Sequence, residues 1–341
     1  MPLPIVHHEA YTAEIPADHR FPMRKYDRLA ALIRAAGLAE AGFARPEAAS
    51  AAELARAHDA AYVDAVLGFG LPPAIVREIG LPMNETVVRR AATAAGGTIL
   101  AARLALETGL ACNTAGGSHH ARAEQGAGFC TFNDVAVAIG VLLAERRIET
   151  ALVVDCDVHQ GDGTAAIFAG DARVTTLSLH GERNYPVRKR ASTIDIGLSD
   201  GTEDAAYLEA LGAILPPLLD RLQPDIVFYN AGVDPHRDDR LGRLAMSDDG
   251  AARQHGRGSG ALARSALGGR HRRRLWQRCR GRRTAPPVAL PRSGRLRGLR
   301  VRGGGGWSGF RPRTRRGIPA RYRARTAPRS PCARRRRYAR N

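Results

Sequence analysis

The chain has 341 residues, of which 44% are hydrophobic and 5% are aromatic, and its formal net charge is +19. The last 91 residues (251–341) hold 29 of the 52 basic side chains, all of them arginine, and none of the 33 acidic ones. Residues 1–250 therefore carry a net charge of −10, which excludes a basic nucleic-acid-binding protein as a description of the whole chain.

The first half of the chain predicts three helices. Residues 27–41 and 86–108 are rich in Ala and Leu at helical spacing. Residues 134–147 form a third apolar helical segment, which begins with a capping residue at Asn133 or Asp134 and ends in arginines that suit the helix dipole.

Short apolar runs that end at a polar residue predict strands buried on both faces. Residues 151–155 (ALVVD) form such a run, and residues 174–179 and 225–230 repeat the pattern, with a predicted helix over 205–222 between them. Strands and helices that alternate in this way indicate an α/β fold, in which helices pack on the faces of a parallel sheet. Ligands of such sheets bind beyond the carboxyl ends of the strands.

Polar side chains gather at these strand ends and in one glycine-rich loop. His119 and His120 are adjacent in GGSHHARAEQGAGFCTFND, and Asp234 follows the strand at 225–230. The segment DCDVHQGDGT contributes four further candidates, which are Asp155, Asp157, His159 and Asp162.

The spacing of the DCDVHQGDGT segment points to a metal site. Residues two apart on an extended chain point to the same side, so Asp155, Asp157 and His159 would lie together after a buried strand. Such a cluster is costly unless something binds it. Asp157 and His159, joined by Asp234, would give a catalytic divalent cation three ligands and leave a fourth position open. The tandem histidines would then be free to transfer protons.

Each of these features also has an ordinary structural explanation when it is taken alone. The Asp-x-Asp-x-His pattern suits a helix cap followed by a surface turn. The adjacent histidines His119 and His120 suit a hydrogen-bonded loop, and Asp234 before Pro235 suits a turn. Their joint placement at one edge of a predicted sheet favours a metallohydrolase.

The order of these motifs resembles the zinc-dependent histone deacetylase family. The resemblance covers about residues 4–250, and the segments HRFPMRKY (19–26) and DRLGRL (239–244) are most similar to the class IV branch and its bacterial relatives. It implies the three-layer arginase–deacetylase fold, with a mainly parallel sheet and helices on both faces, here truncated on its C-terminal side. Arginases share the acidic cluster, but they use two manganese ions and lack paired histidines before a GFC segment.

The resemblance also implies roles for individual residues. The implied ligands of Zn²⁺ are Asp157, His159 and Asp234. The implied catalytic residues are His119, backed by Asp155, and His120, backed by Asp162. The implied walls of an acyl-lysine tunnel are Gly128 and Phe129 on one side and Tyr185 on the other, although an exposed turn would also explain this tyrosine. A structural K⁺ site is implied near Asp155, Ser178 and Leu179. Gln160 departs from the pattern, because many members have a second histidine there.

The pattern breaks after residue 250. The family places an oxyanion-stabilising tyrosine in a Gly-Gly-Tyr loop, some forty residues beyond Asp234, but the chain reads RHRRRLWQRC at 270–279. One hypothesis is a genuine Arg-rich, disordered tail that binds nucleic acid through phosphates. The other is a frameshift near residue 250. The genetic code permits VIGGGYGSDVEAAARHRRS when residues 270–288 are read one nucleotide later.

These observations give the expected domain organisation and function. Residues 1–250 are predicted to form an incomplete deacetylase-like catalytic domain, and residues 251–341 an Arg-rich or out-of-frame tail. We expect a zinc-dependent hydrolase that removes acetyl or other acyl groups from lysine side chains or small amides; the alternative is an impaired remnant whose tail binds nucleic acid. The sequence has no apolar run of about 18 residues, no signal peptide pattern and no paired cysteines, so a cytoplasmic protein without membrane spans is expected.

Overall fold

The computed structural model describes residues 3–255 and 274–278. The elements follow one another along the chain as β1 (Ile5–Val6), η1 (Glu9–Tyr11), α1 (Lys25–Ala35), α2 (Ala51–Leu54), α3 (Ala60–Leu67), α4 (Pro73–Ile79), α5 (Glu85–Thr108), β2 (Leu110–Asn113), α6 (Asp134–Ala144), β3 (Ala151–Asp155), α7 (Asp162–Ile167), β4 (Val174–Gly181), β5 (Ile194–Leu198), α8 (Asp204–Leu222), β6 (Ile226–Asn230) and β7 (Arg274–Arg278).

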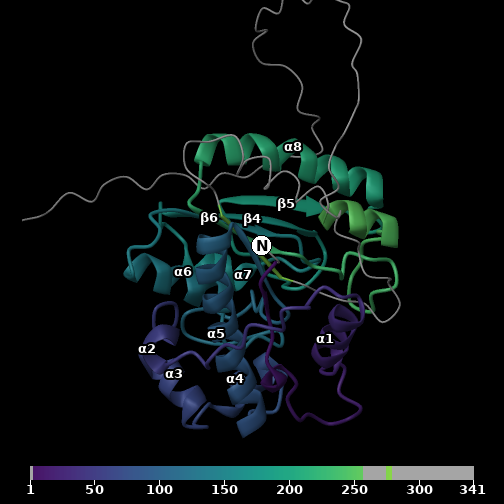
Figure 1. The fold of residues 1–341 in the computed structure, drawn as a ribbon. Helices are drawn as coiled ribbons and strands as arrows, with labels where there is room; N and C mark the ends of the chain where they lie inside the picture. The colour runs from purple at the N-terminus through teal and green to yellow at the C-terminus, as the bar shows by residue number, and fades with distance from the viewer. Residues whose placement is uncertain (1–2, 256–273, 279–341) are drawn as a thin grey trace, which may run out of the picture.

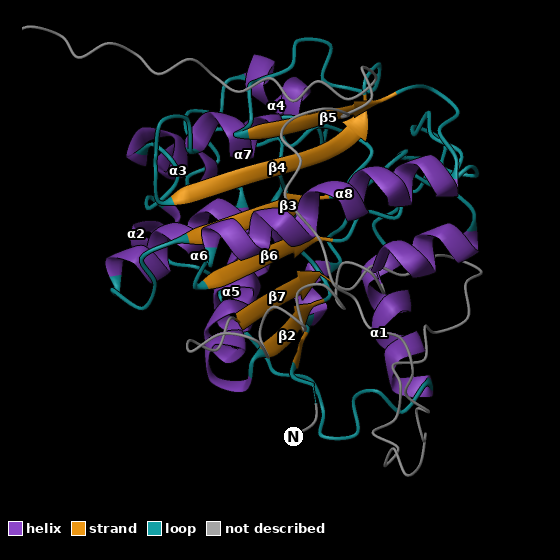
Figure 2. Ribbon diagram, turned by 90° about the horizontal axis from the view of Figure 1, so that it is seen from above, coloured by secondary structure: helices purple, strands orange, loops and turns teal. Residues whose placement is uncertain are grey.

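The strands form one parallel sheet in the order β1-β2-β7-β6-β3-β4-β5, as Figure 2 shows from above. Asp155 at the end of β3 is in register with Ser178 of β4 and Asn230 of β6. The carboxyl ends of these three central strands therefore meet at one edge, where ligands of parallel sheets bind.

Two hydrophobic clusters make the fold three-layered. On β3, Ala151 and Val153 belong to the cluster that contains α5 and α6, whereas Leu152 and Val154 belong to the cluster that contains α8. Figure 1 shows α8 on one side of the strands and α5 and α6 on the other. Because successive strand residues point to opposite faces, a run such as ALVVD has to be apolar throughout. The predicted α/β fold with helices on both faces is confirmed.

The predicted helices and strands are present, but two of the helices end earlier than predicted. The helix predicted over 27–41 ends at Ala35, because Gly37 adopts a positive φ and the amide of Leu38 bonds back to the carbonyl of Ile33. The helix predicted over 134–147 ends at Ala144, where Arg146 takes the positive φ. The short elements β1, η1, α2, α3, α4, β2, α7 and β5 were not predicted.

Strand β7 comes from the Arg-rich part of the chain, where no strand was predicted, and it pairs with β2 and β6. Most of residues 251–341 lies outside the described residues, so the tail and the frameshift stay hypotheses. The family's tyrosine was expected within residues 270–279, of which the structure describes 274–278 as β7. None of the helices within the described part of the chain is long and apolar enough to cross a membrane.

Candidate metal and proton-transfer site

The three candidate metal ligands lie together beyond the ends of β3 and β6. One side-chain atom from each of Asp157, His159 and Asp234 falls within 4.8 Å of the others. His159 Nδ1 is 3.0 Å from Asp157 Oδ1 and 3.4 Å from Asp234 Oδ2. The juxtaposition expected from the spacing of these residues is therefore present.

Backbone contacts fix the loop that carries two of these ligands. The amide of Asp157 donates to Asp155 Oδ1 at 3.1 Å, and the amide of Val158 donates to Asp234 Oδ1 at 2.9 Å. Gly232 lets the chain after β6 approach this loop, because a Cβ there would lie 2.4 Å from Asp157 Cα. A residue without a side chain is required at this position.

The ligand types of the three side chains, and the two distances from His159, suit zinc. Zinc binds a mixture of imidazole nitrogen and carboxylate oxygen, and tetrahedral ligands at about 2.0–2.1 Å from the ion lie about 3.3 Å from one another. The two His159 distances, 3.0 and 3.4 Å, bracket this spacing. Burial opposes the charged imidazolium, but hydrogen bonds and charges of Asp157 and Asp234 outweigh it and raise the pKa of His159 to about 10. The site therefore concentrates negative charge and attracts a cation.

The tandem histidines are each backed by a carboxylate. His119 Nδ1 is 2.6 Å from Asp155 Oδ2, and His120 Nδ1 is 2.7 Å from Asp162 Oδ1. Both imidazoles are buried, and their ring centroids are 4.1 Å apart. A carboxylate at Nδ1 holds the ring orientation and leaves Nε2 for other partners. Nε2 of His119 lies 3.7 Å from Asp157 Oδ1, so this face of the pair is directed at the candidate ligands.

The two histidines differ in their electrostatic surroundings. Burial lowers the pKa of His119, but the charges of Asp155 and Asp157 outweigh it and raise the pKa to about 9. Burial and the neighbouring positive charge of His119 lower the pKa of His120 to about 4, against the hydrogen bond to Asp162. One imidazole of the pair is thus charged and the other neutral near pH 7. A divalent cation held by Asp157 would reduce the pKa of His119, because it would neutralise one of the carboxylates that raise it.

Asp134 supports the backbone just before His119, a role that the sequence did not indicate. Its carboxylate accepts from the amides of Gly117 at 3.0 Å and Ser118 at 2.7 Å, and from the hydroxyl of Thr98 at 2.6 Å. Asn133, and not Asp134, caps the helix by accepting from the amide of Ala136. Sequence reasoning considered both residues as caps alone. A polar pair such as Asn-Asp, of which one member suffices as a cap, is a signal that the other has a partner elsewhere.

His58 supports the backbone just after His120, and sequence reasoning missed it. Its Nδ1 donates to the carbonyl of Arg122 at 2.8 Å, and its Nε2 accepts from the amide of Asn133 at 2.9 Å. Both bonds require the neutral ring, and burial lowers the pKa of His58 to about 4. Because its partners lie 64 and 75 residues away, no local pattern could have identified this histidine.

The candidate tunnel residues lie around His120. The Tyr185 ring meets the His120 ring edge to face, with centroids 4.8 Å apart. A Cβ at Gly128 would lie 2.6 Å from His120 Cδ2 and 3.2 Å from Tyr185 Cε1, so the glycine contacts both rings. Phe129 adopts a positive φ, and its ring contacts that of Phe21 at 5.3 Å. The structure brings Gly128 and Tyr185 together at His120. Phe129 instead packs against Phe21 of the HRFPMRKY segment.

The residues of the candidate K⁺ site occupy neighbouring strands. Asp155 of β3 pairs in register with Ser178 of β4, and Leu179 follows directly. Ser178 Oγ lies 3.0 Å from His180 Nδ1. This arrangement leaves the potassium site a prediction.

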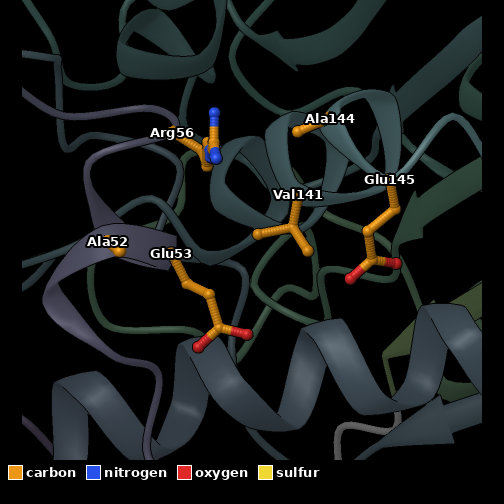
Figure 3. Close-up of a pocket in the computed structure, with 6 residues that line it drawn as sticks. All are labelled: Ala52, Glu53, Arg56, Val141, Ala144 and Glu145. Carbon is orange, nitrogen blue, oxygen red and sulfur yellow. The ribbon is translucent and has the colours of Figure 1, made fainter.

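A surface hollow lies apart from the candidate site. It is formed by α2, α6 and the residues that follow them, which are Ala52, Glu53, Arg56, Val141, Ala144 and Glu145 (Figure 3). Arg103 of α5 pairs with both carboxylates, at 3.8 Å from Glu53 and in closer contact with Glu145. None of the candidate site residues lines this hollow.

The sequence of residues 19–261 matches the histone deacetylase domain. An uncharacterized protein of Picosynechococcus sp. is 47% identical over 255 residues, which cover 74% of this chain and 85% of that protein. Histone deacetylase 2 of Arabidopsis thaliana is 41% identical over 158 residues, covering 46% of this chain and 41% of that protein. The acetoin utilization protein AcuC of Staphylococcus aureus is 34% identical over 170 residues, with 46% and 43% covered. The chain thus spans less than half the length of the last two.

Two solved structures share the fold. The HD domain of HDA15 has a TM-score of 0.66 and 22% identity, covering 82% of this chain and 83% of that one. A histone deacetylase homologue complexed with SAHA has a TM-score of 0.69 and 21% identity, covering 82% and 80%. Identities this low bear on the fold alone. Because the domain match spans well over half of the chain and agrees with the fold, this protein belongs to the histone deacetylase family.

Proposed function

We propose that this protein is a zinc-dependent deacetylase that acts on acylated lysine side chains or related small amides. Membership in the histone deacetylase family supports hydrolysis of an amide bond. The observation that carries the proposal is the position of two carboxylate-backed histidines, His119 and His120, beside Asp157, His159 and Asp234. Manganese and the two-metal chemistry of arginases would not need this histidine pair.

Asp157, His159 and Asp234 would hold the zinc ion, with a fourth position open to substrate or water. When bound, zinc supplies Lewis acidity, which polarises a carbonyl and makes water more acidic. Val158 and Gly232 maintain the site, since the Val158 amide orients Asp234 and the missing side chain of Gly232 leaves room for Asp157.

His120 is the candidate general base. Asp162 holds its Nδ1, and its lowered pKa keeps the ring neutral near pH 7, so Nε2 can take a proton from an attacking water. His119, held at Nδ1 by Asp155, is the partner that can supply a proton to the departing amine. Positioned acid–base groups of this kind contribute about 10²–10⁴-fold in rate.

The sequence puts the activity of this particular chain in question. The tyrosine expected to donate a hydrogen bond to the oxyanion is absent from residues 270–279 as written. Loss of one such donor costs about 10²–10³-fold in kcat, or about 3–4 kcal/mol. We therefore propose, as a second function, an impaired zinc-binding remnant. The observation that favours it is the composition of residues 251–341, which contain 29 arginines and no acidic residue. Such a segment would bind nucleic acid through its phosphates.

Metal analysis together with a fluorogenic acetyl-lysine assay separates these proposals. One zinc per chain with hydrolysis of the acetyl-lysine supports the enzyme. One zinc per chain without hydrolysis, but with salt-dependent binding of nucleic acid, supports the remnant. In an active preparation, His120→Ala should lose most of the hydrolytic rate and retain its zinc, whereas Asp234→Ala should lose the zinc. Unchanged turnover in His120→Ala would refute the assignment of the general base.

A further inference from the structure

Gln160 directly follows the candidate metal ligand His159, yet its side chain is turned to another part of the molecule. The residue is 1% exposed. Its Oε1 accepts from the amide of Arg190 at 3.0 Å, while its Nε2 donates to the carbonyl of Arg190 at 2.6 Å and to Asp195 Oδ1 at 2.8 Å. The amide group thus pairs with the backbone of one residue in both directions and with a carboxylate.

The partner segment is the loop between β4 and β5, residues 182–193, which carries Tyr185. Much of this loop faces solvent, and Val187 is 96% exposed. Within the loop, Lys189 Nζ donates to the carbonyl of Pro186 at 2.7 Å. The first half is also held by Asn184, whose Nδ2 donates to the carbonyl of Leu241 at 2.8 Å and whose Oδ1 accepts from the amide of Arg243 at 3.2 Å. The Gln160 amide bonds the second half of the loop to the chain segment of the candidate metal site.

The same loop places an aromatic wall over the candidate catalytic residues. The Tyr185 ring lies 4.8 Å from the His120 ring and 6.5 Å from the His159 ring. A shift of the loop relative to His159 would therefore change the space between Tyr185 and the opposite residue, Gly128. Loop segments with few buried contacts move readily unless a specific bond holds them.

We propose that Gln160 is a positioning residue that holds the Tyr185 loop at a fixed distance from the candidate metal and proton-transfer site, and so determines how well an acyl chain binds there. The consequence for the acyl chain rests on the proposed function. The tether itself does not, because it is a property of the fold.

The three bonds explain why glutamine suits this position. A neutral histidine, which the family often has here, offers one donor and one acceptor, so it can replace at most two of the three bonds. A glutamate has no donor, and its carboxylate would face that of Asp195 where an amide now donates at 2.8 Å. The expected order of loop restraint is Gln160, then Gln160→His, then Gln160→Glu.

Hydrogen exchange on the zinc-loaded full chain tests the tether. In Gln160→Glu, the amides of residues 183–192 should exchange at least tenfold faster, a change of about 1.4 kcal/mol or more, because both hydrogen bonds donated by Nε2 are lost. Gln160→His should lie in between. Gln223→Glu makes the same chemical change at an exposed glutamine at the end of α8 and should leave the loop unchanged. If Gln160→Glu does not fold, Gln160→Asn, whose shorter side chain cannot reach all three partners, takes its place.

Binding of an acetyl-lysine peptide tests the consequence. Its Kd, or its KM in an active preparation, should rise about five- to tenfold in Gln160→Glu, because part of the lost restraint on the loop carries over to the bound peptide, with kcat and zinc content close to those of the unaltered chain. Faster loop exchange with an unchanged Kd would overturn the role in acyl binding, and unchanged loop exchange in a folded variant would overturn the tether. If the unaltered chain binds zinc but no peptide, the proposed function fails, and the exchange experiment still decides on the tether.

Discussion

Asp134→Ala should destabilise the protein and loosen the turn that carries the tandem histidines. Asp134 is 1% exposed and accepts three hydrogen bonds, from the amides of Gly117 and Ser118 and from the Thr98 hydroxyl. Alanine accepts none of them.

The size of the effect follows from these bonds. Each buried donor left without an acceptor costs about 1–3 kcal/mol. The Thr98 hydroxyl can rotate to another acceptor, and Ser118 is only partly buried. The loss of each of these two hydrogen bonds should therefore cost about 1 kcal/mol. The loss of a negative charge at the start of α6 adds about 0.5 kcal/mol. Removal of a buried carboxylate returns part of its desolvation cost. We therefore expect the free energy of unfolding to fall by about 3–4 kcal/mol.

Urea denaturation measures this change, and Asp27→Ala is the matched control. Asp27 also lies in the first turn of a helix, α1, but it is exposed, so its loss should cost no more than about 0.5 kcal/mol. Asp134→Asn keeps one acceptor and should fall between the two. Hydrogen exchange should show faster exchange of the Gly117 and Ser118 amides in Asp134→Ala. If this variant is no less stable than Asp27→Ala, the hydrogen bonds of Asp134 do not hold the turn.

Two further predictions concern other supports of the site. His58 has a folded pKa of about 4, below its unfolded value of about 6.5, so its contribution is present above pH 6.5 and is lost as the pH falls towards 4. The free energy of unfolding should fall by about 2 kcal/mol more in the unaltered chain than in His58→Gln between pH 7.5 and pH 5, measured by urea denaturation; equal slopes would contradict this. Gly232→Ala should reduce zinc affinity at least tenfold in a competition assay with a chelator, because its Cβ would lie 2.4 Å from Asp157 Cα. The control is Gly197→Ala, whose Cβ meets only ordinary contacts at 3.5 Å and which should bind zinc normally.

Site residues could be predicted from the sequence where they directly follow a predicted strand. Asp155, Asp157 and His159 follow an apolar strand at alternating positions, and their convergence with Asp234 needs only the rule that parallel strands end at one edge. Supporting residues such as His58 could not be found this way, because their partners are distant in sequence and their residue types have no local signature.

The same distinction applies to the fold. The long helix α5 and the apolar strand β3 follow from local periodicity. The end of α1 at Ala35 depends on the left-handed conformation of Gly37, which the Ala-rich pattern does not reveal. Strand β5 (IDIGL) is an edge strand whose pattern is only partly apolar, because just one side of it pairs with another strand.

Strand β7 bears on the two hypotheses for residues 251–341. It lies inside the sheet between β2 and β6, where its register partners Ile226, Phe228 and Ala111 are fully buried. Interior parallel strands are typically apolar throughout, as β3 and β6 are here. The sequence of β7, RLWQR, begins and ends with arginine.

The shifted reading removes both arginines of β7. Read one nucleotide later, codons 270–275 permit Val-Ile-Gly-Gly-Gly-Tyr, which puts two apolar residues just before β7 and the Gly-Gly-Tyr of the family across its start. The family match at residues 19–261 ends shortly before this point. A frameshift thus accounts for the charged strand and for the missing tyrosine with a single event, whereas a genuine Arg-rich tail accounts for neither. Resequencing the gene across codons 245–280 decides between them. An uninterrupted frame without these codons would refute the frameshift, and a restored frame should yield a more active chain, because it regains the oxyanion donor.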